Sequence, residues 1–533
     1  MKMFEFRGSH RSMIVAKNGM VASSQPLAVQ AGIDILKKGG NAIDAAIAVA
    51  ATLNVVEPMS TGIGGDAFAL IFSQKDDKLH AINASGWSSE NASIDFFKEQ
   101  GFEKIPLFGI HSISVPGAVS GYEKCLQEFG TMSLKEVLKP AIYYAEKGFP
   151  VSELISFSWH RAEEKLRSHP ATAKTYLPLG HAPNIGDIHY SKDLAKTFKL
   201  IAKGGAEEFY KGTIAKKIVK FLNDNGGNFT LDDFAAYEAE WVEPISSKYK
   251  DYEVFQCPPN GQGIATLLEL NILKWFELDS LQHNSAAYLH LLIEAKKLAW
   301  ADLRAFAADP RFNPLPLPQL LSEEYSIKQQ NRIDLNKAAT NVAPGLDWSS
   351  GDTVYLSVVD KERNVVSFIN SLYYSFGSGL VAEGTGICLQ NRGNLFSLDK
   401  KHLNALAPRK RPFHTIIPSM VMQNNLPILN FGVMGGDMQP QGQMQVFLNL
   451  IEFGLNVQQA IEAPRVRHYD DNTVALEQGI TAQTRVGLLL KGHKIRNDIG
   501  EFFGGAQAIA IDNERDVLFG GSDPRRDGCA MGY

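Results

Sequence analysis

The segment GDTVYLSVV, residues 351–359, decides the fold that we predict for this chain. It opens with a glycine and an aspartate, which favour turns, and side chains of alternating direction follow at once. One face carries Val354, Leu356 and Val358, and the other carries Tyr355, Ser357 and Val359. This period of two predicts a β-strand that begins at Thr353, and it raises the question of why a threonine stands first.

The composition is that of a large globular protein. The chain has 533 residues, 44% of them hydrophobic and 21% charged, so it can bury a core without disulfide staples. Its formal net charge of −5 argues against a nucleic-acid partner, because nucleic-acid-binding proteins are normally basic. We expect the one compact basic run, residues 409–411, to be a solvated loop or a local ligand contact.

Neither the cysteines nor the amino terminus indicates a special compartment. The four cysteines form no CxxC pair and predict no disulfide framework or zinc site. The amino terminus lacks the apolar region of a secretory signal, and the longest apolar stretch, residues 45–56, is too short to span a bilayer. We therefore expect a cytoplasmic protein with no membrane, metal or cofactor.

The arrangement of helical and strand patterns predicts a layered fold. Helical patterns cover residues 24–40, then a helix capped by Asn41, and later residues 284–310; residues 313–350 are expected to form a loop. Strand patterns follow over residues 353–360, 365–373, 419–423 and 427–436, with a hairpin that turns near residue 513. Helices outside paired antiparallel strands indicate an α+β fold, an αββα sandwich.

The glycine-rich segment GIGGDA, residues 62–67, fits a loose dinucleotide-binding pattern. A nucleotide-binding loop leads from a strand into a helix, whereas these glycines follow a helix and lead into a strand. We therefore interpret the segment as a tight turn packed against another stretch of backbone.

Thr353 becomes a nucleophile if the bond between Asp352 and Thr353 is cut. The freed α-amino group has an ordinary pKa near 8, so its neutral fraction can take the proton of the threonine hydroxyl. Nucleophile and base then lie on one residue, and no histidine is required. The hydroxyl and the spacing alone leave open that Thr353 is an ordinary β-branched residue that opens a strand.

Gly435 and Gly436 stand between a strand pattern and a helix pattern. Amide N–H groups at such a helix start can stabilise a developing oxyanion. A simple strand-to-helix turn that needs small residues explains the pair equally well.

Taken together, these segments resemble the γ-glutamyltransferase (γ-glutamyltranspeptidase) family of N-terminal-nucleophile (Ntn) hydrolases. The resemblance covers nearly the whole chain and rests on ordered segments such as MVASSQPLAVQAGIDILKKGGNAIDAAIA, GIGGDAFALIF, PPNGQGIATLLELNIL, GDTVYLSVVD, APRKRPFHTIIPSM and GSDPRRDGCAMGY. It is closest to the γ-glutamyltransferase-like and cephalosporin-acylase-like branch.

The resemblance implies a proenzyme that cleaves itself before Thr353. A large subunit, 1–352, would stay packed against a small subunit, 353–533, as one intertwined fold and an αβ heterodimer. Thr353 would form the acyl-enzyme, Gly435 and Gly436 the oxyanion hole, and Ser371 would position the amine of the nucleophile. Whether the heterodimer dimerises further stays open.

The substrate-binding positions depart from the family pattern. Family members hold the glutamyl ammonium group with Asn, Gln and Asp, where this chain has Tyr373, Arg392 and Leu395. The serine pair that binds the α-carboxylate becomes His414 and Thr415. Where the family has an early arginine, this sequence has Trp87. The loop between Phe396 and Arg411 is shorter than the corresponding loop of typical family members. A guanidinium should repel an ammonium group and attract a carboxylate.

We therefore expect a self-processing amidohydrolase of the γ-glutamyltransferase or glutathione hydrolase type. Its substrate would be a γ-glutamyl or related acyl amide, with water favoured over an amine as the acceptor. One alternative is an acylase for glutaryl-like or other non-glutamyl amides, which Arg392 favours. Another is an inactive paralogue that serves as a scaffold.

Overall fold

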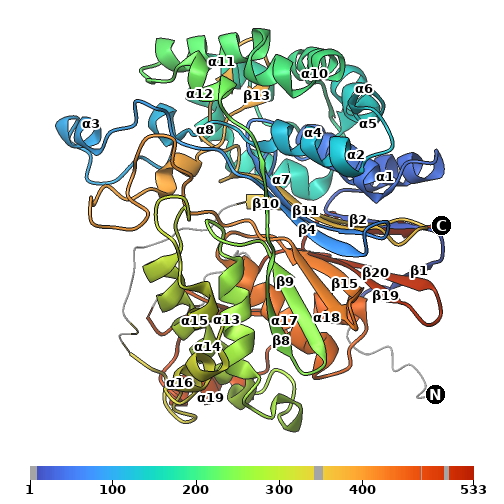
Figure 1. Ribbon diagram of the computed structural model, residues 1–533, viewed down its shortest axis with the longest axis vertical. Helices are drawn as coiled ribbons and strands as arrows, with labels where there is room; N and C mark the ends of the chain where they lie inside the picture. Colours follow the sequence, from blue (N-terminus) through green and yellow to red (C-terminus); the bar gives the residue numbers. More distant parts are fainter. Residues whose placement is uncertain (1–8, 341, 343–351, 470, 497–502) are drawn as a thin grey trace.

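The chain folds into four layers, with two stacked sheets between two layers of helices (Figure 1). The computed structural model describes residues 9–340, 342, 352–469, 471–496 and 503–533. The α+β class and the αββα layering predicted from the sequence are confirmed.

The first sheet contains the strand that begins at the predicted threonine. Its seven strands pair antiparallel throughout. In spatial order they are β21 (Cys529–Gly532), β2 (Met20–Ser23), β10 (Asp352–Val359), β11 (Val365–Tyr373), β3 (Asp66–Ser73), β4 (Lys78–Ala84) and β7 (Glu240–Val242).

The second sheet also has seven antiparallel strands and lies directly under the first. Its spatial order is β1 (Ile14–Ala16), β20 (Val517–Ser522), β19 (Ala506–Asp512), β15 (Leu426–Val433), β14 (Ser419–Gln423), β9 (Tyr252–Gln256) and β8 (Ile245–Tyr249). Contacts of β10 with β15 and β19 join the two sheets.

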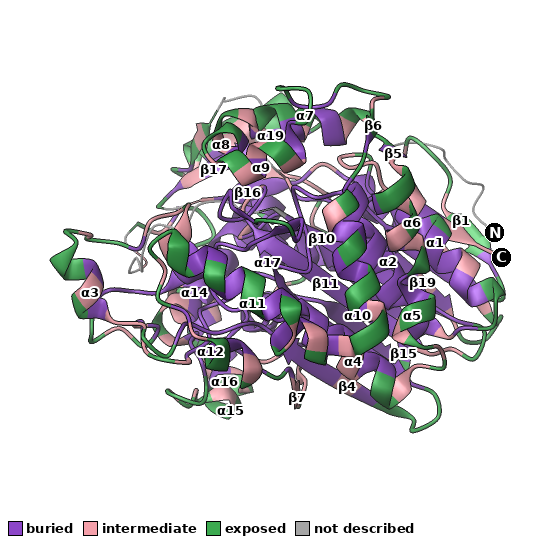
Figure 2. Ribbon diagram, turned by 90° about the horizontal axis from the view of Figure 1, so that it is seen from above, coloured by how far each residue is buried: buried purple, intermediate pink, exposed green. Residues whose placement is uncertain are grey.

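Each sheet has its own helical cover, as Figure 1 shows. The first sheet is covered by α1 (Pro26–Lys37), α2 (Ala42–Val56), α4 (Ala118–Phe129), α6 (Lys139–Lys147) and α10 (Lys192–Tyr210). The second is covered by α13 (Gly263–Leu273), α14 (Ala286–Phe306), α17 (Met438–Ile451), α18 (Val457–Glu462) and α19 (Ala482–Leu490). In Figure 2 the central strands and α2 are buried, whereas the outer helices expose one face.

Strand β10 is buried on both faces, which explains why both of its alternating sets are largely apolar. Tyr355 faces the second sheet, where its hydroxyl lies 3.2 Å from the Asn430 side-chain oxygen and its ring packs on Gly432. The opposite face of the strand packs against α2. A β-branched threonine fits the start of such a strand, so the strand alone does not reveal its chemistry.

Local signals at the amino-terminal helices are confirmed. Asn41 caps α2 by accepting from the amides of Ile43 and Asp44, each at 3.0 Å, and the Asp44 carboxylate accepts from the Asn41 amide at 2.9 Å. This reciprocal pair is a capping box, which satisfies amide groups that a helix start leaves open.

Two other expectations were wrong. Residues 313–350 were expected to be a loop, but the described part contains α15 (Leu317–Leu320) and α16 (Glu323–Gln330); the helix α16 is capped by Ser322 and packs on α13. Such short helices gain their stability from tertiary packing more than from a local pattern.

The basic run at residues 409–411 is not a solvated loop. Lys410 and Arg411 are buried, and Arg411 pairs with Glu240 at 2.7 Å while its amide donates to Asp309. The run therefore holds the segment in place against the rest of the chain.

The four cysteines, Cys125, Cys257, Cys388 and Cys529, are free thiols. Among the described residues, no helix is both long enough and apolar enough to cross a membrane.

Candidate active site

Thr353 and Ser371 meet where β10 and β11 pair. The register is irregular there, because Ser371 and Leu372 of β11 together lie opposite Thr353. Such an irregularity re-aims side chains. The hydroxyl of Thr353 donates to the hydroxyl oxygen of Ser371 at 3.3 Å, and the side-chain amide of Gln439 lies 3.4 Å from the same threonine oxygen. All three side chains are buried.

The backbone around Ser371 fixes the direction of its hydroxyl. The amide of Tyr373 donates to the Ser371 hydroxyl oxygen at 2.8 Å, and Tyr373 has a φ of +83°. A positive φ is costly for an aromatic residue and needs support from its surroundings. Close packing supplies such support, because a Cβ on Gly65 would come within 2.2 Å of the Ser371 carbonyl oxygen.

The GIGGDA segment therefore has the role of a packed turn, as predicted. A Cβ on Gly64 would lie 2.0 Å from the carbonyl oxygen of Cys388, so no larger residue fits. The turn presses on two chain segments that carry site residues, which ties its glycines to the geometry of Ser371.

Arg392 lies directly beside the two hydroxyls. It begins the short 3₁₀ helix η3 (Arg392–Leu395), and its side chain is fully buried. Its guanidinium donates to Ser371 Oγ at 3.0 Å and to Thr415 Oγ1 at 2.6 Å, and it stacks 4.6 Å from the ring centroid of Tyr373. Burial lowers the pKa of Arg392 to about 10, which still leaves the group charged at neutral pH.

The side chain of His414 forms a hydrogen bond with Asp66. Its Nε2 lies 3.0 Å from the Asp66 carboxylate, and both side chains are buried. Burial, helped by the nearby Arg392, lowers the pKa of His414 to about 3, so the ring is neutral and donates to the carboxylate. The other Asp66 oxygen accepts from three donors, which are the amides of Gly86 and Gly117 and the side chain of Gln390.

The Gly435–Gly436 turn is linked to the threonine through Gln439, whose backbone amide donates to the Gly436 carbonyl and whose side chain lies 3.4 Å from Thr353 Oγ1. Both glycines have positive φ values, +116° and +57°, and their carbonyls accept from the amides of Met438 and Gln439 at the start of α17. Within the described chain, neither glycine amide donates a hydrogen bond. Two unengaged N–H groups at a helix start can bind an oxyanion.

The position at which an acid is expected for an ammonium group is occupied by Leu395. Leu395 is buried in an apolar cluster with Tyr373, Phe413 and Trp300. Trp87 is also structural, because its indole N–H donates to the carbonyl of Asp233 at 3.0 Å.

The predicted site residues Thr353, Ser371, Tyr373, Arg392 and Thr415 thus lie in one contiguous cluster, and His414 faces away from it toward Asp66. The side chain of Asp352 is outside the described part.

Sequence reasoning missed three residues of the cluster, Asp66, Gln262 and Gln439. Gln262 donates to the carbonyls of Thr415 and Gly436 at 2.5 and 2.9 Å, so it joins two parts of the site. Asp66 ends the GIGGD turn, and an acid after a buried turn was the signal available for it. The two glutamines have no such local signal.

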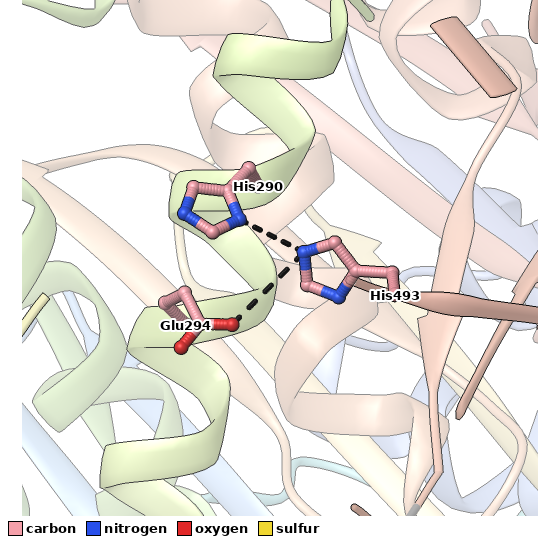
Figure 3. A group of neighbouring side chains, drawn as sticks. All are labelled: His290, Glu294 and His493. Carbon is pink, nitrogen blue, oxygen red and sulfur yellow. Dashed lines mark hydrogen bonds and ion pairs between the residues drawn. The ribbon is translucent and has the colours of Figure 1, made fainter. Parts of the chain in front are cut away.

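A second buried cluster, His290, Glu294 and His493, has side chains of the kind that bind metals (Figure 3). His290 Nε2 lies 2.8 Å from the Asp334 carbonyl and must donate to it, so His290 Nδ1 accepts from His493 Nε2 at 2.8 Å. The Glu294 carboxylate is bound by the Lys297 ammonium at 2.6 Å. The lysine already supplies the cation next to the carboxylate, so the contacts describe a hydrogen-bond network.

Two stacked antiparallel sheets between helices, with a threonine at the head of a central strand, define the architecture of the Ntn hydrolases. The chain belongs to the γ-glutamyltranspeptidase family, whose profile matches residues 28–533.

Known proteins of differing activity resemble this chain over nearly its whole length. The "Glutathione hydrolase-like YwrD proenzyme" of Bacillus subtilis is 42% identical, with 97% of this chain and 99% of that protein covered. The "Oxamate amidohydrolase proenzyme" of Klebsiella pneumoniae is 35% identical over 97% of this chain and 99% of its own. The crystal structure of cephalosporin acylase from Bacillus halodurans superposes with a TM-score of 0.93 at 42% identity, covering 100% and 99% of the two chains.

Proposed function

We propose that the chain cleaves itself between Asp352 and Thr353 and that Thr353 is then the nucleophile of an amidohydrolase. The observation that carries this proposal is the hydroxyl contact between Thr353 and Ser371 at the head of β10. The fragments 1–352 and 353–533 would remain associated as an αβ heterodimer, because each sheet contains strands from both.

The same residues account for turnover. The neutral α-amino group of Thr353 takes the hydroxyl proton while Oγ1 attacks the substrate amide carbon. The amides of Gly435 and Gly436 donate to the resulting oxyanion. The proton then passes to the leaving nitrogen as the C–N bond breaks, which leaves an ester on Oγ1. Water, deprotonated by the amine, attacks this ester, and Oγ1 regains a proton as the acid departs.

The reaction is of the glutathione hydrolase type, with a γ-glutamyl or related acyl amide as substrate and water favoured over an amine as acceptor. The similarity to the glutathione hydrolase-like YwrD proenzyme of Bacillus subtilis supports this class.

A second candidate is an acylase for acyl groups that carry a carboxylate and lack an α-ammonium group. The specific observation is Arg392, buried beside the nucleophile, with Leu395 where an ammonium would need an acid. An unpaired ammonium at such a buried site costs several kcal/mol, about 3–5 kcal/mol when one partner of an ion pair is missing.

The first test is the intact mass of the purified protein beside Thr353→Ala and Thr353→Ser variants. Two fragments from the wild type and the Ser variant, with the smaller starting at residue 353, and one whole chain from the Ala variant are expected. A wild type that stays whole after long incubation contradicts the proposal and favours the alternative of an inactive paralogue that serves as a scaffold. For the processed enzyme, comparing γ-glutamyl and glutaryl p-nitroanilides decides between the two acyl groups.

A further inference from the structure

We propose that Arg392 is a positioning residue whose charge keeps the α-amino group of Thr353 neutral at neutral pH. The inference rests on the proposed function and explains how that function is reached. A free amino terminus has a pKa of about 7.7–8.0, so most of it is protonated at pH 7 and cannot accept the hydroxyl proton. A nearby cation disfavours that protonated form.

The contacts place the cation close enough to act. Arg392 Nη2 lies 3.0 Å from Ser371 Oγ, which lies 3.3 Å from Thr353 Oγ1, so two hydrogen bonds in series connect the guanidinium to the nucleophile. The α-amino group created by cleavage is on the same residue as that Oγ1. Burial of all three side chains removes most of the screening by water.

The direct partners of Arg392 do not cancel its charge. They are the hydroxyls of Ser371 and Thr415 and the ring face of Tyr373, all neutral groups. Burial raises the pKa of the Tyr373 phenol, so this ring stays neutral as well. A carboxylate in the place of either hydroxyl would neutralise the guanidinium charge. None of the described contacts of Arg392 is with a carboxylate.

Among the described residues, two acids also act electrostatically on members of this cluster, Asp66 and Asp437. Asp66 is the cross-strand neighbour of Ser371, but it accepts from three N–H donors and from neutral His414, and the dipoles of these four donors offset its field. Asp437 is partly exposed at the start of α17, and the water that reaches it weakens its field. Arg392 is the charged group that touches the hydroxyl cluster directly.

The test compares the processed wild type with Arg392→Gln, which keeps a neutral donor, and Arg392→Lys, which keeps the charge. The first measurement is kcat/KM against pH on the p-nitroanilide that the wild type hydrolyses fastest, because this ratio reports the free enzyme. We expect the acid limb to move up by about one pH unit or more in the Gln variant and to stay within about half a unit in the Lys variant. A purely structural loss would lower kcat/KM equally at every pH.

A second measurement needs no substrate and no variant. Trace labelling with acetic anhydride at several pH values titrates the Thr353 amine of the small fragment, with the amino terminus of the large fragment as an internal reference. We expect the wild-type Thr353 amine to titrate below pH 7 and the reference near its ordinary pKa of about 8.

The outcomes separate the two proposals. An active, processed enzyme whose Thr353 amine titrates near 8 or above, or whose Gln variant keeps the wild-type acid limb, overturns the role of Arg392 and leaves the proposed function standing. A wild type that never cleaves overturns both. If the Gln variant alone fails to mature, the labelling of the wild type decides.

Discussion

The Thr353 cluster and the His290–His493 network are both buried polar clusters, but they differ in how their charge is balanced. In the network, the Lys297 ammonium lies 2.6 Å from the Glu294 carboxylate, and the other described hydrogen bonds join the His290 and His493 rings or are made with carbonyls and an amide. In the Thr353 cluster, the Arg392 guanidinium meets only hydroxyls and a ring among its described contacts.

This difference distinguishes a cluster that stabilises the fold from one that can act on a reacting group. In the network, the charges of Lys297 and Glu294 offset each other. The hydrogen bonds of Lys297 with Asn472 and of His290 with His493 hold α14 against these distant parts of the chain. A cation that lacks a direct counter-charge keeps its field available for a titrating or reacting group. Burial alone therefore does not identify an active site, whereas burial with an unbalanced charge beside a hydroxyl does point to one.

Breaking the balanced pair should give the largest effect. Lys297→Met leaves the Glu294 carboxylate buried and unpaired, and we expect a loss of about 3–5 kcal/mol in the free energy of unfolding. Denaturant titration measures it, and the activity per folded molecule should be unchanged. The matched control is Lys196→Met, which breaks the exposed Lys196–Asp193 pair of the same i,i+3 spacing and should cost less than about 1 kcal/mol. Equal losses in both variants would contradict the comparison.

The reactive cluster should instead lose activity more than stability. Gly435→Ala places a side chain at a φ of +116° and displaces an amide proposed to bind the oxyanion, so kcat should fall by about 10²–10³. The control Gly454→Ala has a φ of +61° in open space and should pay only the backbone strain, about 1–2 kcal/mol of stability. An unchanged kcat in the Gly435 variant would remove this turn from the mechanism.

Glu269 on α13 sharpens the comparison as a buried acid whose carboxylate oxygens have no hydrogen-bond partner in the described chain. Burial raises the pKa of Glu269 to about 8 from an ordinary 4.5. Because the folded-state pKa of Glu269 lies above its unfolded value, the stability that depends on the protonated carboxyl is fully present below pH 4.5. It is lost as the pH rises from 4.5 through 8. We expect the contribution of Glu269 to the free energy of unfolding to fall by roughly 1 kcal/mol per pH unit between pH 5.5 and 7.5.

The matched variant for this pH dependence is Glu269→Gln, which cannot ionise, so the stability difference between the variant and the wild type should change by roughly 1 kcal/mol per pH unit over that range. Thermal unfolding at several pH values measures both proteins. The same slope in the wild type and the variant would assign the pH dependence to another group.

Much of the fold could be predicted from local patterns. The alternation after Thr353, the Asn41 cap and the glycine turn before β3 are local, because each depends on residues that are neighbours in the chain. The substitutions at Tyr373, Arg392 and Leu395 could also be recognised in the sequence, because these residues replace polar residues of the family pattern.

The rest depended on contacts between distant segments. Nothing near Arg392 indicates that its guanidinium reaches Ser371 and Thr415, and nothing near His414 indicates Asp66, 348 residues earlier, as its partner. The solvated loop expected at residues 409–411 was wrong for the same reason, because the burial of this run depends on Glu240 and Asp309.

The order of strands also determines how the two fragments would behave once the bond before Thr353 is cut. In the first sheet, β10 lies between β2 of the large fragment and β11 of the small one, and in the second sheet β14 pairs with β9 across the same division. Neither fragment could leave without stripping hydrogen bonds from the middle of both sheets. The heterodimer should therefore melt in a single transition, and because unfolding releases two separate chains, its midpoint should rise with protein concentration.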